Sequence, residues 1–167
     1  MKKNMYIGAA VAVVVIIVLI YFGFFNFNRG AQPTAPAQTN TGAQALMDEI
    51  RSTGTVAALR VITTVASTST EPGAMVGDTI SVNYVGVLPD GTMFDASQNH
   101  GGPFSFILGV DSVIQGWQQG LVGMKVGERR LLAIPPALGY GDRGQGSIPP
   151  NSTLLFDVEM VKIQPAE

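Results

Sequence analysis

Alternating apolar and polar residues predict a β-rich domain over residues 55–167. In residues 79–84, Ile80, Val82 and Tyr84 fall on one face of a strand, because successive side chains in a strand point to opposite faces. The same pattern predicts strands at residues 59–65, 104–108, 130–134 and 154–163. Pro89-Asp90-Gly91 is a turn sequence, since proline presets φ and glycine accepts a positive φ.

One stretch, residues 111–124, follows the helical period instead. Its apolar residues recur at steps of three and four, at Ile114, Trp117, Leu121 and Met124. Asp111 or Ser112 is placed to cap this helix, and Gly116 and Gly120 should keep it short. The globular part is therefore expected to be α+β, with an antiparallel sheet wrapped around one short helix.

The segment before the globular part divides into a linker and a possible helix. Residues 29–40 are rich in Ala, Pro, Gln and Thr and have no apolar period, which is typical of an extended tether. In residues 41–53, Leu46, Met47 and Ile50 have near-helical spacing, and Gly54 would end the helix. We treat residues 29–54 as a flexible linker with a short helix of no assigned function.

Residues 5–28 are the most apolar part of the chain, with no charge and 20 hydrophobic residues out of 24. About 20 apolar residues span a bilayer core as a helix. A cleavable signal peptide, the alternative, would have a shorter apolar core that ends at a small-x-small site. This core ends instead at Phe24, Phe25 and Phe27. We therefore expect an uncleaved signal anchor, a single transmembrane helix, over residues 1–28.

The charges that flank this apolar run predict its orientation. Lys2 and Lys3 precede it and Arg29 follows it, which favours a cytoplasmic N-terminus. The globular domain would then be extracytoplasmic, in a periplasm or at a cell surface. The Lys-Lys-Asn start has a bacterial style.

Composition excludes several kinds of chemistry. The chain has no cysteine and one histidine, which excludes disulfides, thiol catalysis, iron–sulfur sites and multi-histidine metal sites. Its 10 basic and 12 acidic residues form no basic cluster, so nucleic-acid binding is not expected. We expect no cofactor and no metal.

Two motifs look catalytic but lack the context that they need. Gly139–Gly144 fits G-x-G-x-x-G, yet prolines on both sides replace the strand and helix of a dinucleotide site. Asp95, Ser97 and His100 lie in one short segment with no nucleophile elbow, which argues against a hydrolase.

Five further motifs follow one another in the globular part. They read Val82-Asn-Tyr84-Val-Gly86, Asp90-Gly91-Thr-Met-Phe94-Asp95, Pro103-Phe-Ser-Phe106, Val113-Ile114-Gln-Gly116-Trp117 and Ile148-Pro149-Pro150. In order and spacing, the stretch from about Leu59 to Ile163 resembles the FKBP-type peptidyl-prolyl cis-trans isomerases. The resemblance implies a strongly bent sheet around a short helix, with an apolar pocket between them.

The resemblance also implies a site. Trp117 would form the pocket floor, and the Ile114 N–H and the Tyr140 hydroxyl would donate to the substrate. The catalytic residues would be Phe94, Asp95, Trp117 and Tyr140. The substrate-binding residues would be Tyr84, Phe94, Asp95, Phe104, Val113, Ile114, Trp117, Tyr140, Ile148 and Phe156. Phe106 is left for the core.

Two positions depart from the family pattern. His100 stands where many members have a basic partner for the pocket aspartate, so that pair should be weaker or pH-sensitive. The loop from Tyr140 to Pro149 is one residue shorter than in small members, with Gln145 where they often have histidine.

The implied activity is catalysis of X-Pro rotation in unfolded or partly folded extracytoplasmic polypeptides, with macrolide-type compounds as inhibitors. Rotation needs no proton transfer and no covalent intermediate, which agrees with the composition. Two alternatives use the same pocket. One is a non-catalytic proline-binding module or holdase, and the other is a small-molecule carrier.

Overall fold

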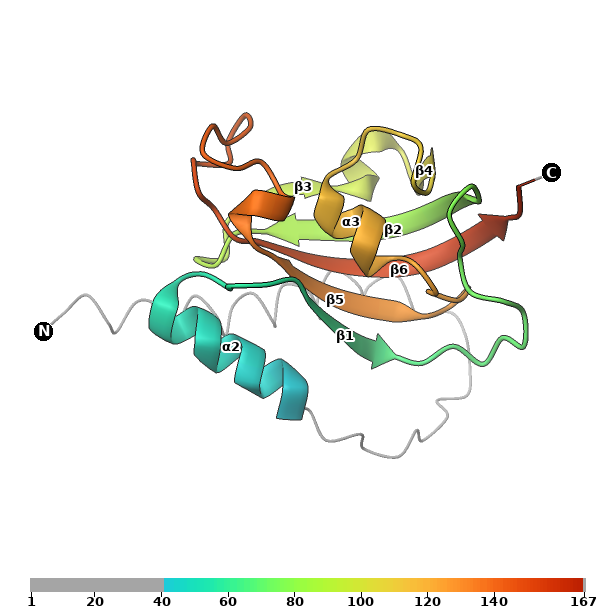
Figure 1. Ribbon diagram of the computed structural model, residues 1–167, viewed down its shortest axis with the longest axis horizontal. Helices are drawn as coiled ribbons and strands as arrows, with labels where there is room; N and C mark the ends of the chain where they lie inside the picture. The colour runs from blue at the N-terminus through green and yellow to red at the C-terminus, as the bar shows by residue number, and fades with distance from the viewer. Residues whose placement is uncertain (1–40, 167) are drawn as a thin grey trace, which may run out of the picture.

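The computed structural model describes residues 41–166, in which one antiparallel sheet curves around a short helix (Figure 1). The helices are α2 (Thr41–Thr53) and α3 (Gln115–Gly120), with short 3-10 helices at Ser97–His100 and Pro136–Leu138. The strands are β1 (Arg60–Val65), β2 (Thr79–Val87), β3 (Met93–Ala96), β4 (Phe104–Ile107), β5 (Arg129–Ile134) and β6 (Leu154–Gln164). The predicted antiparallel sheet on a short helix is confirmed.

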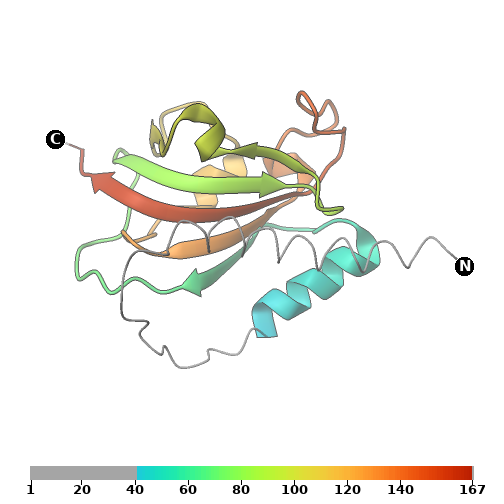
Figure 2. The same ribbon diagram turned by 180° about the vertical axis from the view of Figure 1, so that it is seen from behind.

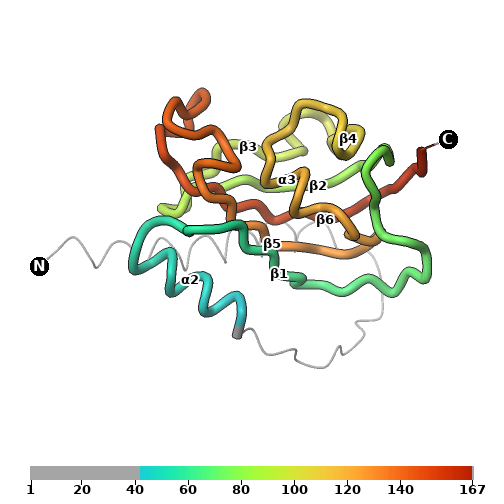
Figure 3. The backbone as a smooth tube through the Cα atoms, viewed as in Figure 1, coloured from blue at the N-terminus to red at the C-terminus, as the bar shows by residue number. Residues whose placement is uncertain are grey.

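The strands lie in the order β1-β5-β6-β2-β3, and β4 pairs with the other end of β2. The longest pairing joins β2 to β6, from Thr79 opposite Gln164 to Val87 opposite Leu155. A register shift between Ser81 and Val82 interrupts it, and such bulges bend and twist a strand. The tube in Figure 3 shows how the chain crosses from β1 to β2 through a long connection before the sheet is completed.

The main core fills the inner face of the sheet under α3. Because side chains alternate along each strand, Leu132 and Ile134 of β5 face this core while Leu131 and Ala133 face the other way. Trp117, Leu121 and Met124 come from α3 and the turn after it, and all three are buried. Gly116 and Gly120 allow this approach, since a Cβ on Gly116 would lie 2.4 Å from Ile134 Cγ2.

A second, smaller core lies on the outer face, where α2 packs. Leu46 and Ile50 of α2 are each 3% exposed and pack in one cluster with residues of β2, β5 and β6. An ion pair of 3.3 Å joins Glu49 to Arg60 of β1. Figure 2, the view from behind, shows α2 alongside β1. The predicted helix over residues 41–53 is therefore present, and it is packed onto the sheet.

The central helix is shorter than residues 111–124, and the expected capping by Asp111 or Ser112 is wrong. The N-cap of α3 is Ile114, which makes no side-chain cap. The Asp111 carboxylate instead accepts the Ile107 N–H at 2.7 Å, which ties the loop to β4. After Gly120 the chain turns away through Gly123, whose φ is +74°.

In residues 41–166, no helix has the length and apolar character needed to cross a membrane. The anchor expected over residues 1–28 and the tether expected over residues 29–40 lie outside the described residues.

Candidate active site

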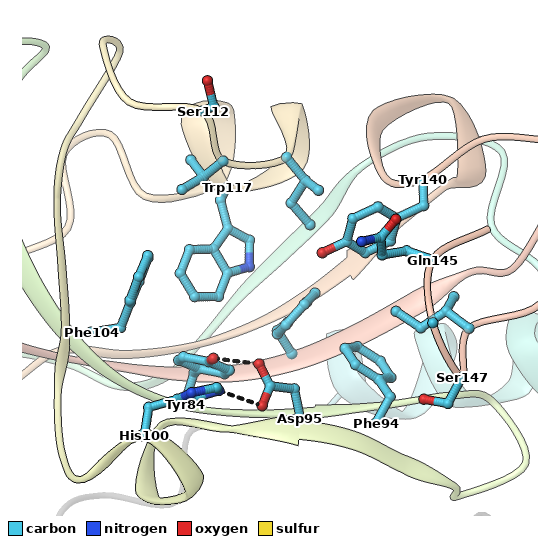
Figure 4. Close-up of a pocket in the computed structure, with 15 residues that line it drawn as sticks. Tyr84, Phe94, Asp95, His100, Phe104, Ser112, Trp117, Tyr140, Gln145 and Ser147 are labelled. Atoms are coloured by element: carbon cyan, nitrogen blue, oxygen red, sulfur yellow. Dashed lines mark hydrogen bonds and ion pairs between the residues drawn. The ribbon is translucent and has the colours of Figure 1, made fainter. Parts of the chain in front are cut away.

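A cavity of about 490 Å³ opens between α3, the inner face of the sheet and two loops (Figure 4). That volume falls within the usual range of small-molecule pockets, about 300–1,000 Å³. Fifteen residues line it: Tyr84, Phe94, Asp95, His100, Phe104, Ser112, Val113, Ile114, Trp117, Tyr140, Gln145, Gly146, Ser147, Ile148 and Phe156.

Trp117 is the centre of the aromatic lining. Its ring lies 5.1 Å from Tyr84 and 5.2 Å from Phe156, both nearly edge-on. Such edge-to-face packing fixes ring orientation, because the positive ring edge meets the negative ring face. The buried indole Nε1 has no hydrogen-bond partner among the described residues, and Figure 4 shows it facing the cavity on the Tyr140 side. The pocket floor therefore offers an unused donor.

Gly86 of β2 makes room for the pocket walls. A Cβ at this position would lie 2.6 Å from Phe94 Cε2 and 2.9 Å from Phe156 Cε1. Phe94 and Phe156 themselves pack edge to face at 5.3 Å. The absence of a side chain near the end of β2 therefore lets the rings of Phe94 and Phe156 pack against the sheet.

Asp95 is the polar edge of the pocket. It accepts the Tyr84 hydroxyl at Oδ2 over 2.6 Å and lies 2.9 Å from His100 Nε2 at Oδ1. The Ala96 N–H also donates to Oδ1, at 2.8 Å. Burial raises the pKa of Asp95, but these hydrogen bonds outweigh it, so the pKa of the carboxyl lies below its usual value. Asp95 is therefore ionised at neutral pH.

His100 is the partner of Asp95 on the solvent side. Its side chain is 58% exposed, and exposed ion pairs contribute little, about 0–1 kcal/mol. This geometry agrees with the expectation of a weak pair. The expected dependence of the Asp95–His100 pair on pH stays a prediction.

The two pocket tyrosines are held in their neutral form. The pKa of Tyr140 is raised mainly by burial and to a lesser extent by the nearby Asp95 charge. The pKa of Tyr84 is raised mainly by burial, and next by its hydrogen bond to Asp95. The Tyr84 hydroxyl is used by Asp95. No hydrogen bond of the Tyr140 hydroxyl is found within residues 41–166, so it can donate to a ligand.

All ten residues proposed from the sequence line this one cavity. They come from β2, β3, β4, β6, α3 and two loops, which are separated by up to 72 positions along the chain. Phe106 stays in the core, 3% exposed, as expected.

Sequence analysis missed five lining residues. His100 was noted only as the partner of Asp95, Ser112 only as a helix cap and Gln145 only as a departure from the family pattern, while Gly146 and Ser147 had no assigned role. Gln145 to Ile148 form a tight turn, in which the Gln145 N–H donates to Ile148 O at 3.0 Å and the Ile148 N–H returns to Gln145 O at 2.8 Å. Their position beside Ile148 in the sequence was the available signal.

Within the described part of the chain, no group of three or more acidic or histidine side chains is suited to a metal ion. The pocket chemistry described above rests on aromatic surface, one carboxylate and hydrogen-bond donors.

Comparison with known proteins connects this site to a family. The model of the family "FKBP-type peptidyl-prolyl cis-trans isomerase" matches residues 71–161. FK506-binding protein 2 of Debaryomyces hansenii is 50% identical over 103 residues, which are 62% of this chain and 76% of that protein. Peptidyl-prolyl cis-trans isomerase FPR2 of Saccharomyces cerevisiae is 53% identical over 95 residues, 56% of this chain and 70% of that one. These relatives are eukaryotic and do not support the bacterial source expected from the first residues.

Two solved structures share the fold. The crystal structure of AtFKBP13 has a TM-score of 0.58 and 42% identity, and covers 62% of this chain and 91% of its own. That of FkpA from Escherichia coli has a TM-score of 0.61 and 40% identity, and covers 75% of this chain and 59% of its own. The family match spans more than half of the chain and includes all ten proposed pocket positions, from Tyr84 to Phe156, in one continuous domain. The chain belongs to the FKBP-type peptidyl-prolyl cis-trans isomerase family and is an enzyme of that class.

Proposed function

We propose that this protein accelerates rotation about X-Pro bonds in extracytoplasmic polypeptides and so assists their folding. One observation carries the proposal: a single cavity gathers six aromatic rings around an unused indole donor and one ionised carboxylate. Such a site suits a proline ring and its preceding amide. Among the described residues, neither Ser112 nor Ser147 of the lining is hydrogen-bonded to His100, which pairs with Asp95, so the site does not favour hydrolysis.

Rotation about an X-Pro bond requires a pocket that binds the twisted amide, and no reacting side chain. The planar amide resists rotation by about 18–20 kcal/mol because twisting removes its resonance. A catalyst must bind the twisted amide better than the planar one. A twisted amide is less charge-separated, so a dry apolar pocket costs it less desolvation. Lowering the barrier by about 7 kcal/mol would accelerate rotation by about 10⁵.

The proposed roles divide among three kinds of group. The proline ring would lie on Trp117, with the rings of Tyr84, Phe94, Phe104 and Phe156 around it. The Ile114 N–H and the Tyr140 hydroxyl would donate to substrate carbonyls. Neither donor has an acceptor within residues 41–166, which supports these roles. Val113 and Ile114 would form the rim, and Ile148 would reach the pocket from the long loop. Asp95 would orient Tyr84 and polarise the pocket edge.

Substrates would be unfolded or partly folded polypeptides with accessible proline. The names of the relatives as FK506-binding proteins support FK506 and similar macrolides as inhibitors of this pocket.

We also propose that residues 1–28 anchor the protein in a membrane with the N-terminus in the cytoplasm, and that residues 29–40 tether the domain outside it. The uncharged apolar run at residues 5–28 supports the anchor. In membrane fractions, the full chain should resist carbonate extraction, and protease added on the extracytoplasmic side should reach the domain. Release of the chain by carbonate would contradict the anchor.

The activity is tested on the full chain in detergent micelles by NMR exchange spectroscopy of an Ala-Leu-Pro-Phe peptide. Cis–trans exchange should become fast with catalytic amounts of protein, and FK506 should abolish the effect. Phe94→Ala and Asp95→Val should lower the rate at least tenfold, while Val65→Ala on the exposed strand β1 should not. Tight peptide binding with no acceleration would instead favour the non-catalytic binding module.

A further inference from the structure

Two of the fifteen side chains that line the aromatic pocket can carry a charge near neutral pH, and they lie side by side. His100 Nε2 is 2.9 Å from Asp95 Oδ1, and both side chains line the cavity. The other thirteen lining residues are neutral in this range, including Tyr84 and Tyr140, whose pKa values are raised. The charge at the edge of the pocket is therefore the sum of the charges of Asp95 and His100.

Asp95 keeps its charge whether or not His100 is protonated. The Tyr84 hydroxyl donates to Oδ2 at 2.6 Å, and the Ala96 N–H donates to Oδ1 at 2.8 Å. Figure 4 shows Tyr84 and His100 reaching different oxygens of the carboxylate. An ordinary aspartate already has a pKa of about 3.9, and these donors favour the charged form further. Above pH 5 the carboxylate is therefore ionised.

His100 is the group at this edge that changes its charge. Its side chain is 58% exposed and exchanges protons with solvent, and histidine ordinarily changes charge between pH 5 and 8. The 3-10 helix Ser97–His100 packs on β2 and β3, whose titratable side chains are Tyr84 and Asp95.

The hydrogen bond from His100 to Asp95 can survive deprotonation, because a neutral imidazole keeps one ring N–H, which on Nε2 still donates. The walls of the pocket can therefore stay in place while its edge changes from neutral to singly negative. A substrate that enters the pocket meets this change directly, since both side chains line the cavity.

We propose that His100 is a specificity-determining residue: when protonated, it lets the pocket accept an acidic residue next to the proline, and when neutral, it lets Asp95 repel that residue and attract a basic one. This inference rests on the proposed isomerase function and deepens it. The physical reason is Coulombic, because an unbalanced carboxylate repels a carboxylate and attracts an ammonium group. Solvent and salt screen exposed charges, so the effect should be about threefold and should shrink at high ionic strength.

The experiment uses the full chain in micelles at low salt and two series of capped peptides, Ala-Xaa-Pro-Phe and Ala-Leu-Pro-Xaa, with Xaa as Glu, Gln or Lys. Catalysis is measured as kcat/KM by NMR exchange at several pH values from 5.5 to 8.0. A substrate glutamate is ionised throughout this range, since its pKa is about 4.3. The ratio of the Glu peptide to the Gln peptide cancels any general effect of pH on the enzyme, because the two peptides differ in charge and little else.

In at least one series, the Glu-to-Gln ratio should fall about threefold between pH 5.5 and pH 8.0, and the Lys-to-Gln ratio should rise. His100 is the one histidine of the chain, so its imidazole titration can be followed by NMR on the same sample. The midpoint of the change in ratio should coincide with that titration. Ratios that stay constant in both series, or a midpoint that differs from the imidazole titration, would overturn the proposal.

Two variants separate charge from structure. His100→Arg keeps a positive charge and should hold the Glu-to-Gln ratio at its acidic value at every pH. His100→Gln removes the charge and should hold the ratio at its alkaline value. Asn99→Ala, exposed on the same 3-10 helix, should keep the full pH dependence. A purely structural role for His100 would change turnover of the Glu and Gln peptides equally, and pH dependence that persists in His100→Gln would exclude the proposed role.

The two proposals fail in different ways. If no peptide is isomerised faster, the proposed function fails, while the pH dependence of Kd for the Glu and Gln peptides, measured by fluorescence anisotropy, still tests His100. If the Gln peptides are isomerised but the Glu-to-Gln ratio ignores pH, the proposal for His100 alone fails.

Discussion

The Tyr84 hydroxyl donates a 2.6 Å hydrogen bond to Asp95 Oδ2 and so joins β2 to β3 at the pocket edge. The bond orients the ring that packs edge-on against Trp117 at 5.1 Å. It also stabilises the charged form of the carboxyl. One contact thus sets both the shape of the pocket wall and the charge beside it.

Replacing Tyr84 by phenylalanine removes this bond but keeps the ring. We expect the pKa of Asp95 to rise, because a donor to its charged form is lost. Carboxyl NMR titration of the two proteins measures the change. Tyr140→Phe is the control, since it removes a pocket hydroxyl that makes no hydrogen bond to Asp95. An unchanged Asp95 titration in Tyr84→Phe would contradict this account of the pocket edge.

Tyr84→Phe should also change how the free energy of unfolding depends on pH. The pKa of Asp95 is lowered in the folded state, so its stabilising effect is present above the unfolded pKa of about 3.9 and is lost as pH falls through the folded pKa. In Tyr84→Phe this contribution is smaller. Urea denaturation at pH 7 and pH 2.5 should therefore show a smaller acid-induced loss in the variant than in the unmodified protein.

Replacing Gly86 by alanine should narrow the pocket. The added methyl would clash with Phe94 and Phe156, at 2.6 and 2.9 Å, and push one or both rings into the cavity. We expect at least tenfold weaker binding of FK506 and of X-Pro peptides, measured by calorimetry. Gly42→Ala is the matched control, because a Cβ there meets no atom closer than 4.0 Å and alanine favours the helix. Full affinity in Gly86→Ala would contradict the close packing.

Replacing Glu128 by glutamine should destabilise the fold without touching the pocket. Its carboxylate accepts Arg130 Nε at 2.7 Å, the Lys125 N–H at 2.9 Å and the Thr63 hydroxyl at 3.1 Å. Hydrogen bonds to a charged group contribute about 1.5–3 kcal/mol, so we expect a loss of about 2 kcal/mol at pH 7 by urea denaturation. Glu71→Gln, at an exposed position, should change little.

The pH dependence gives a second test of Glu128. Burial raises its pKa, but the Arg130 and Lys125 hydrogen bonds outweigh it and hold the pKa below its usual value. The stabilisation is thus present above the unfolded pKa of about 4.3 and disappears as pH falls through the folded pKa. The difference in unfolding free energy between Glu128→Gln and the unmodified protein should therefore shrink between pH 7 and pH 2.5. A constant difference would show that the carboxylate charge has no part in it.

Truncating Ile50 to alanine tests whether α2 belongs to the folded domain. Ile50 is 3% exposed in the outer core, and such truncations cost about 2–5 kcal/mol. We expect about 2 kcal/mol, since a peripheral helix can shift to fill part of the space. Gln44→Ala, on the exposed side of α2, should have no such effect. Equal stability of the two variants would mean that α2 does not stabilise the sheet.

Local pattern was enough to predict most elements, because it reports which face of each element is buried. The alternation in residues 79–84 and 154–163 predicted β2 and β6, and the spacing of Leu46 and Ile50 predicted α2. The N-terminus of α3 was less predictable. Asp111 looked like a cap, but tertiary structure gave its carboxylate a different donor, the Ile107 N–H.

The sequence by itself determined five of the six described strands, the two α-helical segments and, through ordered motifs, ten of the fifteen residues that line the pocket. Alternation and motif spacing are local properties, and they persist whatever the chain packs against. Only the tertiary structure decided that β1 lies beside β5, that α2 covers the outer face, and that Asp95 accepts the Tyr84 hydroxyl. These relationships join residues far apart in the chain, and their free energies arise from burial and hydrogen-bond geometry that no local pattern contains.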